Sequence, residues 1–166
     1  MAITTKLSEI SFGTNISNIE VPAHLNRTCA TNVNFVDSAM GGRGFTPSSV
    51  TLFTGEPGAG KTTMVLTIAS EVAKKKDAMC VFNTAEESLF QIKKTVNRLG
   101  LRGDFACGNL SNIDEVIEGC RHMMQLNPGK QMFLVIDSLQ QMNATHERYG
   151  KGYRSDSLVL EKILNF

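Results

Sequence analysis

A short segment in the first half of the chain has the residue types and the spacing of a phosphate-binding loop. It fits the pattern G-x-x-x-x-G-K-[ST] and reads Gly55-Glu56-Pro57-Gly58-Ala59-Gly60-Lys61-Thr62. Its glycines allow backbone N–H groups to turn inward around a polyphosphate, at the positive end of the helix expected to follow. Lys61 would reach the terminal phosphates, and the Thr62 hydroxyl would hold Mg²⁺. The pattern therefore predicts a nucleoside-triphosphate site formed by these residues and the adjoining Thr63.

The residues on either side of this loop are of the types that such a site requires. Residues 50–54 are apolar and β-branched, which predicts a buried strand, and residues 63–69 continue at helical spacing. A glycine-rich turn with a chance lysine is the alternative. A strand before the loop and a helix after it disfavour that alternative.

Acidic residues follow two further strand-like segments. Asp137 ends the apolar segment 132–137, so its carboxylate is expected at the carboxyl edge of a sheet, holding Mg²⁺ through water beside Thr62. A carboxylate that only caps the next turn is the alternative. Glu86 and Glu87 follow the segment 78–82, and one of them could be the general base that deprotonates an attacking water. An acidic helix N-terminus explains this pair equally well, so these residues alone leave both roles open.

The elements that must position these side chains alternate along the chain. Helices are expected at 33–40, from 63 to about 76, at 88–99, at 111–126 and at the C-terminal end, with a weak strand at 104–107. This order predicts an α/β fold with a mainly parallel sheet of about four strands, covered by helices on both faces. Residues 1–30 are expected to form a polar N-terminal arm, and residues 31–166 the core.

Composition favours one soluble domain. The 166 residues carry a net charge of +1, which argues against a wholly basic nucleic-acid coat but not against a local basic loop. We expect no membrane span and no signal peptide. The four cysteines form no C-x-x-C pair, and Cys80 and Cys107 are expected to be buried, reduced thiols. These features favour a reducing compartment, and we expect a cytoplasmic protein.

Residues 32–142 resemble the ATPase core of the RecA superfamily, most closely that of bacterial RadA/Sms proteins. Four stretches carry the resemblance: 34–42 before the loop, the loop itself, 86–101 with its Glu-Glu-Ser-Leu opening, and 135–142. The zinc module and the Lon-protease-like domain of RadA/Sms are not matched. The chain is therefore expected to be an incomplete or minimal RecA-like core, truncated after its N-terminal part.

The resemblance also implies individual roles. It places Glu86 on the catalytic glutamate of these ATPases and Gln140 on the residue that senses the nucleotide state. Lys61, which reaches the terminal phosphates, is expected to be the second catalytic residue. An ordinary polar turn residue is the alternative for Gln140. The family further implies ATP and Mg²⁺ as ligands, and a homo-oligomeric ring or filament in which a neighbouring subunit supplies a cation.

One locally basic, aromatic segment follows, at residues 146–154. Flexible glycines, two tyrosines and the cations Arg148, Lys151 and Arg154 suit single-stranded DNA, and the position resembles a DNA-contacting loop of RecA-type proteins. A solvated surface loop is the alternative. The sequence thus favours a DNA-dependent ATPase acting in recombination, repair or replication. A KaiC-like nucleotide-controlled switch without DNA, or a nucleotide-binding subunit without turnover, are the competing interpretations.

Overall fold

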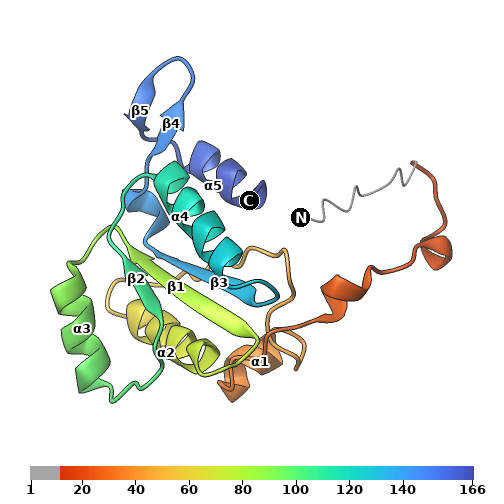
Figure 1. The fold of residues 1–166 in the computed structure, drawn as a ribbon, viewed down its shortest axis with the longest axis horizontal. Helices are drawn as coiled ribbons and strands as arrows, with labels where there is room; N and C mark the ends of the chain where they lie inside the picture. Colours follow the sequence, from red (N-terminus) through yellow and green to blue (C-terminus); the bar gives the residue numbers. More distant parts are fainter. Residues whose placement is uncertain (1–11) are drawn as a thin grey trace.

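A three-stranded parallel sheet lies at the centre of the protein, in a computed structural model that describes residues 12–166 (Figure 1). Its strands are β1 (Ala78–Thr84), β2 (Ala106–Gly108) and β3 (Gln131–Asp137), in the order β2-β1-β3. The central strand β1 is buried along its whole length, because it has a strand on each edge and helices on both faces. In register, Thr84 lies opposite Asp137, so β1 and β3 end side by side.

Helices cover the two faces of this sheet and form two hydrophobic cores. Helices α1 (Asn34–Ala39), α2 (Lys61–Ala73) and α3 (Leu89–Arg98) contribute to one core, and α4 (Ile113–Leu126) and α5 (Asp156–Leu164) to the other. Successive side chains of a strand point to opposite faces, and Phe82 and Val81 accordingly enter different cores. The expected α/β fold with both faces covered is confirmed, although within residues 12–166 the parallel sheet has three strands and not the four or so expected.

The prediction of a buried strand at residues 50–54 is wrong. This segment forms no strand, and Val50, Leu52 and Phe53 are 45%, 67% and 37% exposed. Apolar, β-branched composition is only one requirement of a strand, because the backbone must also form ladder hydrogen bonds with a neighbouring strand, and residues 50–54 form none within the described part of the chain. Among residues 12–166 no strand pairs with the second edge of β3 or with this segment. A chain of aromatic rings connects the two, from Phe53 through Phe45 to Phe133 of β3.

The polar stretch after β3 contains more regular structure than expected. After the short 3-10 helix η3 (Leu139–Gln141), strands β4 (Ala144–His146) and β5 (Gly150–Tyr153) pair antiparallel. This hairpin projects from the body of the molecule (Figure 1). It can form in a glycine-containing loop because Gly150, with φ of 76°, adopts a turn conformation that other residues rarely take.

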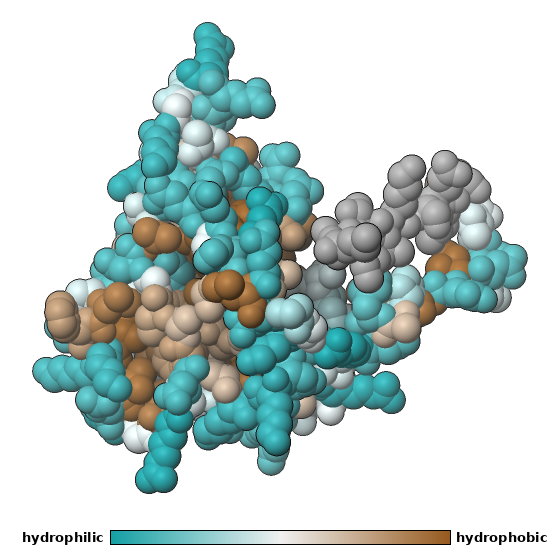
Figure 2. Space-filling model, in the orientation of Figure 1, coloured by the Kyte–Doolittle hydropathy of each residue, from teal (hydrophilic) through white to brown (hydrophobic). Residues whose placement is uncertain are grey.

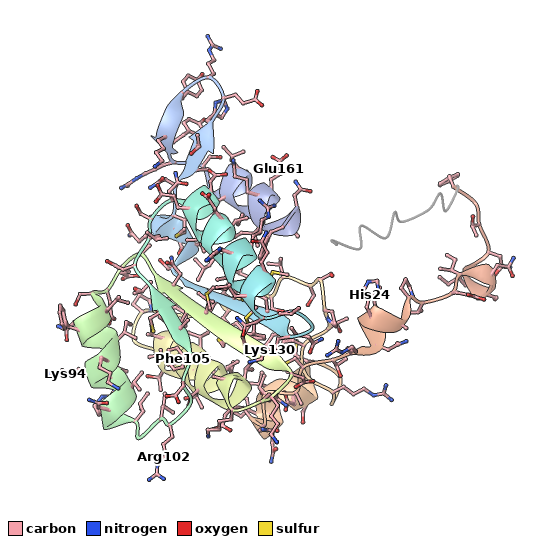
Figure 3. The ribbon with its side chains drawn as sticks, viewed as in Figure 1. His24, Lys94, Arg102, Phe105, Lys130 and Glu161 are labelled. Atoms are coloured by element: carbon pink, nitrogen blue, oxygen red, sulfur yellow. The ribbon has the colours of Figure 1, made fainter. Side chains whose placement is uncertain are left out.

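The N-terminal segment leaves the body of the molecule. Residues 12–28 contain the 3-10 helices η1 (Ile16–Asn18) and η2 (Ala23–Asn26), and they extend to one side, with His24 on η2 (Figures 1 and 3). Its end is tied to the body, because the Gln131 side chain donates to the Arg27 carbonyl at 2.6 Å. Residues 1–11 of the expected arm lie outside the described residues. The division of the chain at residue 30 remains a prediction.

One cysteine differs from its expected environment. Cys80 is buried on β1 and free, as predicted, and burial raises the pKa of its thiol. Cys107 is exposed, because β2 is a three-residue edge strand whose outer side is only partly covered. Within residues 12–166, no helix is long and apolar enough to cross a membrane.

Candidate active site

The glycine-rich loop leads directly into α2, and its backbone conformation requires glycine. Gly58 and Gly60 have φ of 78° and 86°, in the left-handed region, and α2 begins at Lys61 immediately after Gly60. In the part of the chain that the structure describes, no side chain caps this helix, and no acidic residue occupies its first turn. The N–H groups of that turn therefore remain available to an anion, at the positive end of the helix dipole.

The ammonium group of Lys61 folds back over the loop. Its Nζ donates to the carbonyl oxygens of Gly55, at 2.7 Å, and Glu56, at 3.0 Å. The loop is exposed, so an entering ligand can reach these atoms. Hydrogen bonds from an ammonium to phosphate oxygens are stronger than those to neutral carbonyls. The loop, the helix end and Lys61 together fit a triphosphate.

Thr62 and Asp137 come together across the sheet edge, although 75 residues separate them in the sequence. The Thr62 hydroxyl donates to Oδ2 of Asp137 at 2.9 Å. Asp137 is the last residue of β3, and Thr62 lies in the first turn of α2. A hydroxyl and a carboxylate supply oxygen ligands, the type that Mg²⁺ prefers, and Mg²⁺ usually keeps several waters. These two residues therefore fit the predicted magnesium site.

Glu86 and Glu87 lie in the turn that follows β1, at the same sheet edge as Asp137. Both are exposed. The turn is fixed by its backbone, since the Ala85 N–H donates to the Asp137 carbonyl at 2.9 Å and the Glu87 N–H donates to Oγ1 of Thr84 at 3.0 Å. The structure thus brings the expected general base close to the predicted magnesium ligand in the fold. Gln140 follows on η3, exposed at its surface.

The three predicted DNA-binding cations differ in their surroundings. The Arg148 guanidinium lies 5.6 Å from the centre of the Tyr149 ring, and Arg154 is exposed. Lys151 instead forms an ion pair with Glu115 of α4, and a hydrogen bond from Lys151 to this carboxylate raises the pKa of the lysine. Lys151 is therefore the least available of the three to a phosphate.

Aromatic rings gather on the same hairpin. Tyr149 and Tyr153 stack with centroids 5.1 Å apart, and His146 packs against both. The tip of the hairpin is hydrophilic (Figure 2). Other cations, among them Lys94 and Arg102, project into solvent at sites away from the hairpin (Figure 3). The hairpin combines exposed cations with stacked rings in one protruding element.

Sequence analysis missed two asparagines close to this edge. Asn83 is 1% exposed on β1, and Asn109 follows β2. An amide inside an otherwise apolar strand is an available signal for Asn83, since buried polar groups need partners. No local pattern marks Asn109, whose partners lie 22 and 25 residues away.

Comparison with known proteins identifies similar sequences. The family described as "ATPase: KaiC" matches residues 29–155, most of the chain. The DNA repair protein RadA of Mycobacterium tuberculosis is 30% identical over 130 residues, covering 75% of this chain and 25% of the relative. RadA of Haemophilus influenzae is 38% identical over 110 residues, covering 65% and 22%. RadA of Escherichia coli is 38% identical over 108 residues, covering 64% and 22%. The chain thus spans about a quarter of the length of these curated relatives.

Proposed function

The chain belongs to the KaiC-like family of RecA-superfamily ATPases, and on this premise we propose that it binds ATP with Mg²⁺ and hydrolyses it in response to single-stranded DNA. One observation carries the proposal. The hydroxyl of Thr62, directly after the phosphate-loop lysine, meets the carboxylate of Asp137 at 2.9 Å. A phosphate loop and a strand-end aspartate in contact are the two parts that P-loop enzymes use to hold the metal and the nucleotide.

In this proposal each residue has a distinct task. The N–H groups of the loop and Lys61 bind the phosphates of ATP, and Thr62 and Asp137 hold Mg²⁺. When bound, Mg²⁺ neutralises charge on the phosphate oxygens. Glu86 accepts a proton from water while the water oxygen bonds to the γ-phosphorus and the bond to the bridging oxygen of ADP breaks. The products are ADP and inorganic phosphate.

The DNA part of the proposal rests on the hairpin and on the relatives. Arg148 and Arg154 can neutralise backbone phosphates, and the exposed ring of Tyr149 can stack on a base without sequence preference. The curated relatives are named DNA repair proteins. Gln140, between Asp137 and the hairpin, is the proposed sensor of the nucleotide state. A second subunit would supply the cation that completes the site, so we propose a ring or filament of identical chains.

Replacing Glu86 tests the proposal. We expect Glu86→Gln to lower the rate of ATP hydrolysis in the presence of single-stranded DNA by at least about 100-fold, because a general base contributes at least that factor. The dissociation constant for ATP should not change, since the amide keeps the size of the side chain. Glu87→Gln is the matched control, because Glu87 is the exposed neighbour in the same turn. An equal loss of hydrolysis rate in the two variants would contradict the proposal. A rate of ATP hydrolysis that does not change when single-stranded DNA is added at low salt would also contradict it.

The matched family carries the description "ATPase: KaiC", and we propose a switch of that kind as a second candidate function. ATP would then control assembly with a protein partner, and no DNA would be bound. In that case ATP should change the oligomer size measured by light scattering. Removing the charges of Arg148, Lys151 and Arg154 should then have no effect on that change.

A further inference from the structure

The side chain of Asn109 makes two hydrogen bonds that none of the functions above explains. Its Nδ2 donates to the carbonyl oxygen of Thr84 at 2.8 Å and to that of Glu87 at 3.2 Å. Both partners are acceptors, so the position requires a group that donates twice, as an amide nitrogen does. Asn109 thereby bridges the two ends of the turn that carries Glu86.

The same turn is held from inside by Thr84. Oγ1 of Thr84 accepts from the Glu87 N–H at 3.0 Å and donates to the Glu87 carbonyl at 3.2 Å. On the other side of Glu86, the Ala85 N–H donates to the carbonyl of Asp137 at 2.9 Å. The residues before and after Glu86 are therefore both tied to fixed groups. This arrangement fixes the backbone at Glu86, and with it the direction of the Cα–Cβ bond.

Asn109 is itself held in place by the sheet. The buried side chain of Asn83 accepts from the Leu110 N–H at 3.1 Å and donates to the Leu110 carbonyl at 2.8 Å. On the other side of Asn109, Gly108 is paired in register with Asn83. The residues before and after Asn109 are thus both fixed to β1, which leaves its amide little freedom to move.

We propose that Asn109 is a positioning residue, which acts through Glu86 by bridging the carbonyl groups of Thr84 and Glu87. This inference rests on the proposed function, because it requires Glu86 to be the general base. A shift of about 1 Å in a reacting group can lower a rate about 100-fold. Asn109 touches neither phosphate nor water in this scheme, so its loss slows hydrolysis without weakening ATP binding.

Three substitutions test this role. Asn109→Ala should lower the kcat of ATP hydrolysis about tenfold or more, because the base is less well placed, while the dissociation constant for ATP stays within about twofold. Asn109→Gln keeps an amide donor and should restore part of the lost rate. Asn127→Ala is the matched control, since the Asn127 amide donates to the Met123 carbonyl at the far end of α4. It should leave kcat unchanged.

A double variant separates positioning from a general loss of structure. If Asn109 acts through Glu86, the Asn109→Ala, Glu86→Gln double variant should hydrolyse ATP no more slowly than Glu86→Gln alone. Losses that multiply in the double variant would overturn the positioning role while leaving the proposed function intact. Normal turnover in Glu86→Gln alone would instead refute the proposed function.

Hydrogen–deuterium exchange tests the inference without any measurement of ATP hydrolysis. Asn109→Ala should raise the exchange rate of the Glu87 amide, which Thr84 protects, several-fold or more. The amides of β1 should exchange as slowly as before. An unchanged rate at Glu87 would show that the turn does not depend on Asn109, and the inference would then be wrong.

Discussion

Gly108, at the carboxyl end of β2, has no room for a side chain. A Cβ atom there would lie 2.7 Å from Oδ1 of Asn83, the atom that accepts the Leu110 N–H. We expect Gly108→Ala to lower the free energy of unfolding by about 1–3 kcal/mol, because it displaces a buried amide from its partners. Urea denaturation measures the change.

The same chain offers a matched control for that substitution. Gly119 lies inside α4, and a Cβ atom there would meet nothing within 4 Å. Alanine favours a helix over glycine by about 1 kcal/mol, so Gly119→Ala should raise the free energy of unfolding. A similar effect of the two substitutions would show that the contact with Asn83 is unimportant.

For single residues, the sequence predicts a chemical role where that role can be recognised from neighbouring residues in the chain. Lys61 and Thr62 belong to one contiguous pattern, and Asp137 is marked because a charged residue follows an apolar strand. No local sequence pattern identifies Asn109 as a functional residue. Its two partners depend on the register of β2 against β1, and register is a property of the folded sheet.

Among the elements, the helices and the three strands of the parallel sheet follow from residue type and spacing, whereas the pairing at the outer edges of the sheet does not. Helix α3 begins where predicted, with Ser88 accepting the Gln91 N–H, and Asn112 caps α4 in the same way. The side chains of residues 50–54 suit a strand, but this segment forms none. Pairing depends on a neighbouring edge elsewhere in the chain, and local composition carries no information about it.

The carboxylate of Asp114 on α4 helps to fix the base of the β4–β5 hairpin to the body. Oδ2 of Asp114 accepts the Thr145 N–H at 2.7 Å, and Oδ1 accepts from Lys162 of α5. Burial alone would raise the pKa of Asp114, but the hydrogen bonds from Lys162 and Thr145 outweigh it and lower that pKa. The carboxylate is therefore ionised at neutral pH, and it holds the base of the hairpin in one orientation.

The surroundings of the hairpin cations predict that replacing Arg148 weakens DNA binding more than replacing Lys151 does. Arg148→Ala should weaken binding to single-stranded DNA, and it should lower the slope of log K against log salt by about 0.7, one phosphate contact. Lys151→Ala should do less, because Glu115 already neutralises Lys151. Fluorescence anisotropy with an unstructured oligonucleotide, over a range of salt concentrations, measures both.

Replacing the partner of Lys151 provides the control. Glu115→Gln frees the ammonium group without removing it, so this variant should bind single-stranded DNA more tightly than the unaltered protein. Equal weakening by Arg148→Ala and Lys151→Ala, or no effect of Glu115→Gln, would contradict a phosphate-binding hairpin.

Across the whole molecule, burial and pairing divide the sheet into a protected centre and an open side. Strand β1 has a neighbour on each edge and a hydrophobic core on each face. In contrast, β3 has only β1 as a partner among the described residues, and the exposed segment 50–54 lies on no strand. The alternation of elements predicts this α/β architecture, but the open side follows from tertiary pairing and is not visible in the sequence.

We therefore expect the rate of hydrogen–deuterium exchange to depend on backbone pairing in the sheet and not on the hydrophobicity of the side chains. We expect the amides of residues 51–54 to exchange at rates close to those of an unstructured chain, although Leu52 and Phe53 are apolar, because they have no backbone partner among residues 12–166. The amides of β1 should exchange most slowly, since they open only with the whole sheet. Adding ATP and Mg²⁺ should slow exchange in residues 58–63, where the loop and helix end bind phosphate. Slow exchange at 51–54 in the protein alone would show that this segment is paired, and that the open side of the sheet is closed in solution.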